Sequence, residues 1–273
     1  MKTFCVLTQT QYRSNKLLES YKNEFNTDFS SFYKLNWKHL DDTDALVCKQ
    51  NICWSEGRSL LYSHVPKNYE YYIFIDDDII FKNTTDKLSV SEKIRDMLDY
   101  YKPLAGCFNG KHKNGTPEWH LSKIPRKTGA FPIMGYDLNT NIFHHSFAAV
   151  MFPIIYHGSG RCMWYSAYIC HKLYPGKNIC ITDISTKNAR HEDNESFGLE
   201  HFIKPDVITQ KFAANLKNPD DFNCWNHKYI MNKNRSVSSQ PVSREEVLFG
   251  IVDMSKIYDV TCTGFTNRKD SYN

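Results

Sequence analysis

The sequence predicts an α/β protein with a mainly parallel sheet flanked by helices. Residues 2–8 and 71–81 form apolar runs rich in β-branched and aromatic residues, which is typical of strands buried on both faces. Helical patterns alternate with such runs over the first hundred residues, and this order indicates parallel crossovers. At 273 residues the chain is long enough for a sizeable core.

The first elements follow from local patterns. Residues 2–8 predict a strand that ends in polar residues. Ser14 is then expected to cap a helix, because apolar residues follow it at helical spacing: Leu17, Leu18, Tyr21 and Phe25. Residues 31–37 predict a second strand, and the acidic stretch 41–44 predicts a turn or a short helix.

The central part of the chain continues the alternation. Residues 54–62 predict a loop passing into a helix that ends at Pro66, and the next strand begins near Glu70. Residues 91–101 predict a helix with Ile94, Met97 and Leu98 facing inward. Residues 104–108 then predict a short strand.

The second half is less regular. Residues 109–141 predict a long loop, 143–155 a strand, 162–173 an aromatic helix and 179–184 a last short strand. From 205 onward the pattern weakens, although Ser243 and Glu246 resemble a capping box. We therefore expect a catalytic domain over 1–204 and a carboxy-terminal extension over 205–273 that packs on it.

Composition excludes several classes of protein. The net charge of +4 gives no case for nucleic acid as the partner. Nine cysteines without a Cys-x-x-Cys pair favour reduced thiols over a disulfide framework. His144, His145, His157, Cys162 and His171 lack the tight spacing of structural zinc sites. Neither a signal peptide nor a membrane-spanning segment is expected, so a soluble cytoplasmic protein is predicted.

Three consecutive carboxylates, Asp76, Asp77 and Asp78, interrupt the apolar run 71–81. They repel one another and resist burial, but a divalent cation among them would make the arrangement favourable. If the strand continues through them, Asp76 and Asp78 point to the same side. His191, beside further acids, is the expected third ligand of Mn²⁺ or Mg²⁺. The alternative is a solvated turn after a buried strand.

A buried strand followed by Asp-x-Asp about 75 residues into an α/β chain resembles the GT-A class of glycosyltransferases, which have a Rossmann-like sheet. The likeness spans roughly residues 2–203. The stretch from Ile181 to Gly198 is also similar to GT-A-like proteins of plants and of large viruses. The viral enzymes of this type act on capsid glycans. The resemblance implies transfer of a sugar from a nucleotide donor, with UDP as the expected nucleotide, to a hydroxyl of a glycan or glycoprotein. A virus-infected host cell is one implied setting.

The resemblance also implies roles for individual residues. Donor contacts fall on Gln9, Thr10, Arg13, Arg58, Asp76 and Asp77, and metal contacts on Asp76, Asp78 and His191. Asp183 is the first choice for the catalytic base, with Glu192, Asp193 and Glu118 as rivals. Trp119 and His120 form a candidate acceptor platform, with a satellite cluster under the loop as the alternative.

One departure from the class pattern leaves the base and the stereochemical outcome open. Many members place their base at the start of the helix before the last strand, but residues 160–165 contain no acid. Two alternatives also remain open. One is a HAD-like phosphatase or other phosphoryl-transfer enzyme, which also uses Asp-x-Asp at a strand end. The other is a catalytically silent binding module with the same fold.

Overall fold

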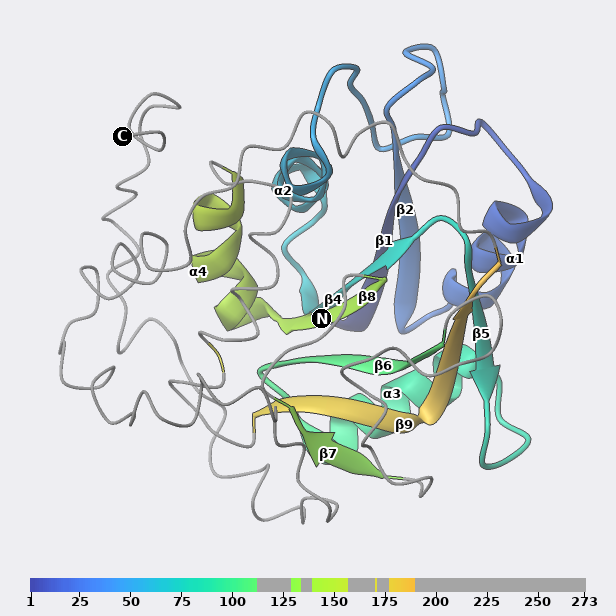
Figure 1. Ribbon diagram of the computed structural model, residues 1–273, viewed down its shortest axis with the longest axis vertical. Coiled ribbons are helices and arrows are strands. Elements are labelled where there is room, and N and C mark those ends of the chain that lie inside the picture. Colours follow the sequence, from blue (N-terminus) through green and yellow to red (C-terminus); the bar gives the residue numbers. More distant parts are fainter. Residues whose placement is uncertain (112–128, 134–138, 157–169, 171–176, 190–273) are drawn as a thin grey trace, which may run out of the picture.

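The computed structural model describes residues 1–111, 129–133, 139–156, 170 and 177–189. Within them the chain forms three layers, with helices on both faces of a twisted sheet (Figure 1). The elements in chain order are β1 (Lys2–Thr10), α1 (Lys16–Phe25), β2 (Ser30–Asn36), β3 (Val47–Cys48), α2 (Trp54–His64), β4 (Tyr69–Asp76), β5 (Ile79–Asn83), α3 (Val90–Tyr101), β6 (Ala105–Lys111), β7 (Ala130–Pro132), β8 (Thr140–His144), α4 (His145–Tyr156) and β9 (Asn178–Asn188). The predicted α/β class is confirmed.

The sheet of the described residues is parallel in its first half and mixed in its second. Its order is β3-β2-β1-β4-β8-β6-β9-β5, with β7 paired to β9. The neighbours β3, β2, β1 and β4 all run parallel. β8 runs antiparallel to β4 and to β6, whereas β9 runs parallel to β6 and antiparallel to β5. The expectation of a mainly parallel sheet therefore holds for the amino-terminal half only.

Side chains on β1 and β4 alternate between two buried cores, as the pleat requires. Cys5 and Leu7 of β1 face the core covered by α2 and α4. Phe4 and Val6 face the opposite core, which is covered by α1 and α3. The two pairs of helices lie on opposite sides of the sheet (Figure 1). Burial on both faces explains why these strands are continuously apolar.

Two helix starts show how the local sequence sets the boundaries. α1 is capped by Asn15, whose Oδ1 accepts from the amides of Leu17 and Leu18 at 2.9 Å. The expectation that Ser14 is the cap is wrong by one residue, because the Ser14 hydroxyl donates to Glu19 instead. α3 begins with a capping box. The side chain of Ser89 accepts from the amide of Glu92, and the side chain of Glu92 accepts from the amide of Ser89.

The apolar run 143–155 was expected to be a strand, and this expectation is wrong. Only its first two residues belong to β8, and the rest form α4, which packs against α2 and β4. After its first two residues α4 is apolar even at an exposed position, Ala149, so it lacks the polar face that would mark a helical period, and its sequence resembles that of a buried strand. The predicted loop 109–141 likewise contains β7 and the beginning of β8.

No helix in the described part of the chain is long and apolar enough to cross a membrane. The predicted helix 162–173, the domain boundary at 204 and the extension 205–273 lie outside the described residues.

Candidate functional site

The three carboxylates lie at a reversal of the chain. Asp76 is the last residue of β4, Asp77 and Asp78 form a turn, and Ile79 begins β5. We call Asp76–Asp78 the acid turn. All three residues are half-buried. Because the strand ends at Asp76, the alternation that was expected to point Asp76 and Asp78 to the same side does not extend through the turn. The chain re-enters the sheet at Ile79, so the acids do not lead into a polar loop.

A buried cation lies beside the acid turn. The side chain of Arg58, on α2, is 2% exposed. Its guanidinium donates to Asp76 Oδ1 at 3.0 Å and to Asn141 Oδ1, on β8, at 2.6 Å. Arg58 is therefore a buried residue and not a surface arginine of the helix. A guanidinium suits this place because its planar fork serves two acceptors at once.

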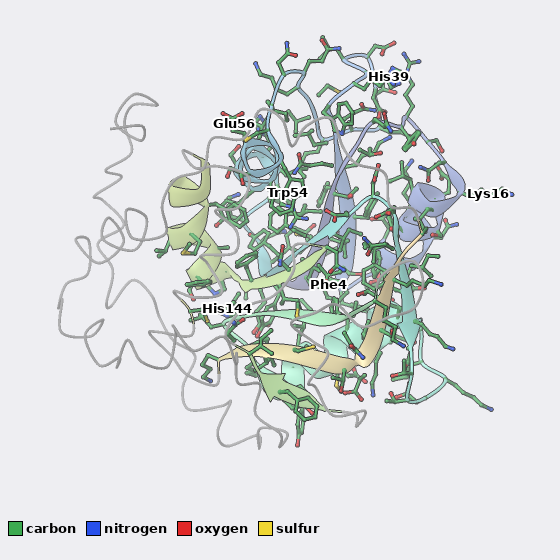
Figure 2. The ribbon with its side chains drawn as sticks, in the orientation of Figure 1. Phe4, Lys16, His39, Trp54, Glu56 and His144 are labelled. Carbon is green, nitrogen blue, oxygen red and sulfur yellow. The ribbon has the colours of Figure 1, made fainter. Side chains whose placement is uncertain are left out.

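Trp54 completes the surroundings of Arg58. It lies at the start of α2 (Figure 2), four residues before Arg58 in the sequence, and its ring centre is 3.6 Å from the guanidinium carbon of Arg58. The indole Nε1 also approaches Asp76 Oδ1 at 3.4 Å. Trp54 therefore makes a cation–π interaction with Arg58 and a weak hydrogen bond to the carboxylate of Asp76. Spacing of four residues on a helix could have indicated this pair, whereas no sequence signal pointed to Asn141.

The carboxyl end of β1 supplies the second side of the site. Thr10 Oγ1 donates to Asp77 Oδ2 at 2.6 Å, which joins β1 to the acid turn. Gln9 Nε2 donates to the carbonyl oxygen of Trp54 at 2.7 Å. A Cβ at position 57 would lie 1.9 Å from Gln9 Oε1, so Gly57 permits this close approach. The structure therefore brings Gln9, Thr10, Arg58 and the acid turn together, and their contacts with a donor stay a prediction.

Arg13 has a different environment. Its guanidinium pairs with Asp41 at 2.5 Å, and both side chains are more than half exposed. Its carbonyl oxygen accepts from the ammonium of Lys34, which is 1% exposed and pairs with the buried Asp42 at 2.8 Å. Burial would raise the pKa of Asp42, but hydrogen bonds from Lys34 and Asn36 lower it below its usual value. This buried pair fixes the loops that follow β1 and β2.

The charge of the acid turn reaches the opposite face of the sheet. Tyr21, on α1, donates its hydroxyl to the carbonyl oxygen of Ile79 at 2.5 Å. Burial raises the pKa of Tyr21 well above its usual value, and Asp77, Asp78 and Asp76 raise it further. Tyr21 thus holds the backbone directly after the turn, and it remains protonated.

The expectation that Asp183 ends a strand is wrong. β9 continues to Asn188, and Asp183 lies in its middle, 6% exposed. Asp183 Oδ2 accepts from the amide of Gly129 at 3.0 Å, and Oδ1 lies 3.7 Å from Lys93 Nζ. Because β9 runs antiparallel along β5, Asp183 lies near Asn83, at the end of β5 remote from the acid turn. Its carboxylate therefore holds Gly129, directly before β7, and does not line this site.

The end of β9 does reach the acid turn. The amide of Ala189 donates to the carbonyl oxygen of Asp78 at 2.7 Å. Asn139 accepts from the amide of Asp76 through its carbonyl oxygen, and its side chain bonds Asn188 at 3.4 Å. Asn139 and Ala189, which lie 63 and 111 positions further along the chain, thus fix the two ends of the turn.

Several predicted site residues lie outside the described residues: Glu118, Trp119, His120, His191, Glu192 and Asp193. Within the ranges that the structure describes, no group of three His, Cys, Asp or Glu side chains has the arrangement of a metal site. The oxygens of the acid turn are hard ligands of the kind that Mg²⁺ and Mn²⁺ take, and further ligands would have to come from beyond Ala189, from solvent or from a substrate.

No family model matches this chain, and no curated protein matches it. The solved structures to which it is similar include two of TarS and one of A197. TarS from S. aureus has a TM-score of 0.45 at 12% identity over 78% of this chain, and TarS 1–349 has a TM-score of 0.45 at 13% identity over 78%. A197 from STIV has a TM-score of 0.39 at 10% identity over 88% of this chain and 95% of its own. This chain spans 39% of the first neighbour's length and 64% of the second's.

Proposed function

We propose that this protein is a glycosyltransferase. It would move a sugar from a nucleotide-sugar donor, with UDP as the expected nucleotide, to a hydroxyl of a glycan or glycoprotein. The observation that carries the proposal is the place of the acid turn. It follows β4 directly and is bonded to the end of β1 through Thr10 and Asp77.

That place is a switch point in the sheet. From β1 the chain crosses to β2 on one side and later to β4 on the other, giving the order β3-β2-β1-β4. Open α/β sheets bind ligands outside the carboxyl ends of their strands at such a point, because the two connections diverge there. Thr10 and Asp76 end the two strands concerned. A nucleotide is therefore expected at the ends of β1 and β4.

The residues present suit a divalent cation. Asp76 and Asp78 would supply carboxylate oxygens, and most of the coordination shell would remain for phosphate oxygens and water. His191 follows Ala189 by two residues, and an extended chain covers about 7 Å over that length. Since Ala189 bonds Asp78, His191 is within reach of the turn. A bound Mn²⁺ or Mg²⁺ would neutralise the charge of the leaving diphosphate.

Arg58 has a separate role in this proposal. Its guanidinium is fixed by Asn141 and Trp54, so it keeps Asp76 in one position whether or not a cation is bound. It also offsets the mutual repulsion of the three carboxylates. A site preorganised in this way loses little free energy in rearranging when a metal and a diphosphate bind.

The base that deprotonates the acceptor is proposed among residues other than Asp183, because both oxygens of that carboxylate already face Gly129 and Lys93. Glu192 and Asp193 follow His191 directly in the chain, and this makes them the first candidates. Glu118 is the third.

Calorimetric titration of the full chain with UDP, with and without Mn²⁺, tests the proposal. We expect UDP binding that depends on Mn²⁺, and its loss in Asp78→Asn with the circular dichroism spectrum unchanged. Asp28→Asn is the matched control, since Asp28 is exposed and far from the acid turn in the chain. Equal affinity in wild type and Asp78→Asn would remove the metal role of the acid turn.

A panel of UDP and GDP sugars then separates the alternatives. Transfer of the sugar to a glycan acceptor identifies the enzyme. Binding without transfer or hydrolysis indicates a silent module. Absence of binding by any nucleotide, combined with release of phosphate from simple phosphate esters, would favour the phosphoryl-transfer alternative.

A further inference from the structure

α1 reaches the acid turn from the face of the sheet opposite to α2. It lies beside β5 (Figure 1), and the ring of Tyr21 packs against the rings of Phe25, Phe32 and Phe81, with centroid distances of 6.3, 5.6 and 6.2 Å. Tyr21 is 2% exposed, so its ring belongs to the core between α1 and the sheet. From this core its hydroxyl donates to the carbonyl oxygen of Ile79, the first residue after the acid turn.

The carbonyl oxygen of Ile79 depends on a partner outside the sheet. Two backbone hydrogen bonds tie the ends of β5 to β9: the amide of Ala189 donates to Asp78, and the amide of Thr84 donates to Asp183. In an antiparallel pair only every second residue bonds the residue opposite it, so the bonded positions alternate along β5 and Ile79 falls between them. Ile79 is fully buried, and a buried carbonyl group without a partner is costly. The hydroxyl from α1 therefore supplies a bond that β9 cannot.

The three acids of the turn are held in different ways. Asp76 and Asp77 are bonded through their carboxylates, to Arg58 and to Thr10. Asp78 is held through the backbone: its own carbonyl oxygen accepts from β9, and the carbonyl oxygen of the next residue accepts from α1. These two bonds come from different elements and hold consecutive peptide groups, so together they fix the course of the chain directly after Asp78.

The position of Ile79 matters for a cation because Asp78 precedes it directly in the chain. A shift of the Ile79 peptide group turns the backbone that carries the Asp78 carboxylate, and a divalent cation takes its oxygen ligands at short, narrowly defined distances. Residues that orient metal ligands in this way typically change metal affinity 10- to 100-fold when they are replaced. Burial raises the pKa of Tyr21, and the three acids raise it further, so the hydroxyl keeps the proton that it donates.

We propose that Tyr21 is a positioning residue of the acid turn. By holding Ile79 from α1, its hydroxyl keeps the Asp78 carboxylate in the place where it can bind a divalent cation. This inference rests on the metal role that the proposed function gives to the acid turn. It adds that part of the cation affinity is set from the opposite face of the sheet, by a side chain that is itself no ligand.

Tyr21→Phe tests the inference, because it removes the hydroxyl and keeps the packed ring. Hydrogen–deuterium exchange of the full chain measures the turn without any metal. We expect the amides of residues 78–82 to exchange about tenfold faster in the variant, since one bond that restrains them is lost. Calorimetric titration with MnCl2, in the absence of nucleotide, measures the consequence, and we expect a Kd about tenfold weaker than in wild type.

Tyr72→Phe is the matched control. Tyr72 is 1% exposed, and its hydroxyl also donates to a backbone carbonyl oxygen, that of Pro66, at 3.3 Å. Pro66 precedes β4, whereas the acid turn follows it, so this variant loses the same kind of bond at the other end of the strand. We expect it to leave both the exchange at the turn and the Kd for Mn²⁺ unchanged. All variants are compared at a temperature at which circular dichroism shows them to be folded.

Three results would overturn the inference alone: unchanged exchange at the turn in Tyr21→Phe, an unchanged Kd for Mn²⁺ in that variant, or an equal weakening of Mn²⁺ binding in Tyr72→Phe. A wild-type chain that does not bind Mn²⁺ would overturn the metal role in the proposed function and this inference with it. The titration of the wild type therefore separates failure of the proposed function from failure of the role of Tyr21.

Discussion

Replacing Arg58 by methionine tests the account of the acid turn. Methionine keeps most of the stem of the side chain and removes the charge and the donors. The hydrogen bond to Asn141 joins two buried side chains and contributes about 2 kcal/mol. The ion pair with Asp76, whose side chain is 34% exposed, adds about 1 kcal/mol, and the contact with Trp54 adds about 1 kcal/mol.

Part of this loss in the free energy of unfolding is offset, because the variant no longer buries a guanidinium. That relief is about 1 kcal/mol, so a net loss of about 3 kcal/mol in the free energy of unfolding is expected. Urea denaturation followed by circular dichroism measures it. Arg95→Met is the matched control: Arg95 also lies over an aromatic ring, Phe29, at 4.6 Å and pairs with an acid, but its side chain is 35% exposed.

We expect Arg95→Met to cost less than about 1 kcal/mol. A loss in Arg58→Met no larger than that in the control would refute the idea that Arg58 holds the site together. Near-ultraviolet circular dichroism adds a local readout, since Trp54 loses its stacked cation in the first variant only.

Three further outcomes follow from the structure. Gly106→Ala places a Cβ 2.4 Å from the carbonyl oxygen of Ile179, so the backbone must shift, and urea denaturation is expected to show a loss of about 3 kcal/mol. The pKa of His144 is about 3 in the folded chain and about 6.5 in the unfolded chain; the unfolded chain therefore binds the extra proton, and stability falls as pH drops below 6.5. Between pH 7 and pH 5 this amounts to about 2 kcal/mol, which His144→Gln is expected to abolish in the same assay. Asp42→Asn leaves the ammonium of Lys34 buried without its carboxylate, and a thermal melt is expected to show a loss of about 3 kcal/mol.

The sequence was most informative where local pattern and tertiary environment agree. β1 and β4 carry the unbroken apolar runs Phe4–Leu7 and Tyr71–Ile75 because helices cover both faces of the sheet. α1 has a single apolar stripe because it lies on the surface. Such elements can be recognised from their period alone. The alternation of strands and helices then fixes parallel crossovers for the first half of the chain.

The second half could not be predicted in this way. A helix that is apolar on every side and a buried strand have similar sequences, so the boundary between β8 and α4 could not be recognised from the sequence. The acids raised a different difficulty. The alternation of a strand predicts that Asp76 and Asp78 point to the same side. The chain instead reverses from Asp77 onward, so that alternation does not apply to Asp78.

The sequence predicted the acids of the candidate site but did not indicate every residue that supports them. Asp76, Asp77, Asp78 and Arg58 stand out as residue types. Asn141 does not, because its importance arises from a contact with Arg58, 83 residues away in the chain. Contacts of that kind are created by the order of strands in the sheet, and neither composition nor period records them.

The backbone hydrogen bond from Ala189 to Asp78 bears on how the chain folds during its synthesis. A chain emerging from the ribosome presents its acid turn early, but the strand that secures the turn is made about 110 residues later. Non-local pairing of this kind forms late in folding, because the entropy of a long loop must be overcome first. The amino-terminal strands can therefore assemble while the turn is still open, and the candidate site is completed only when β9 joins the sheet.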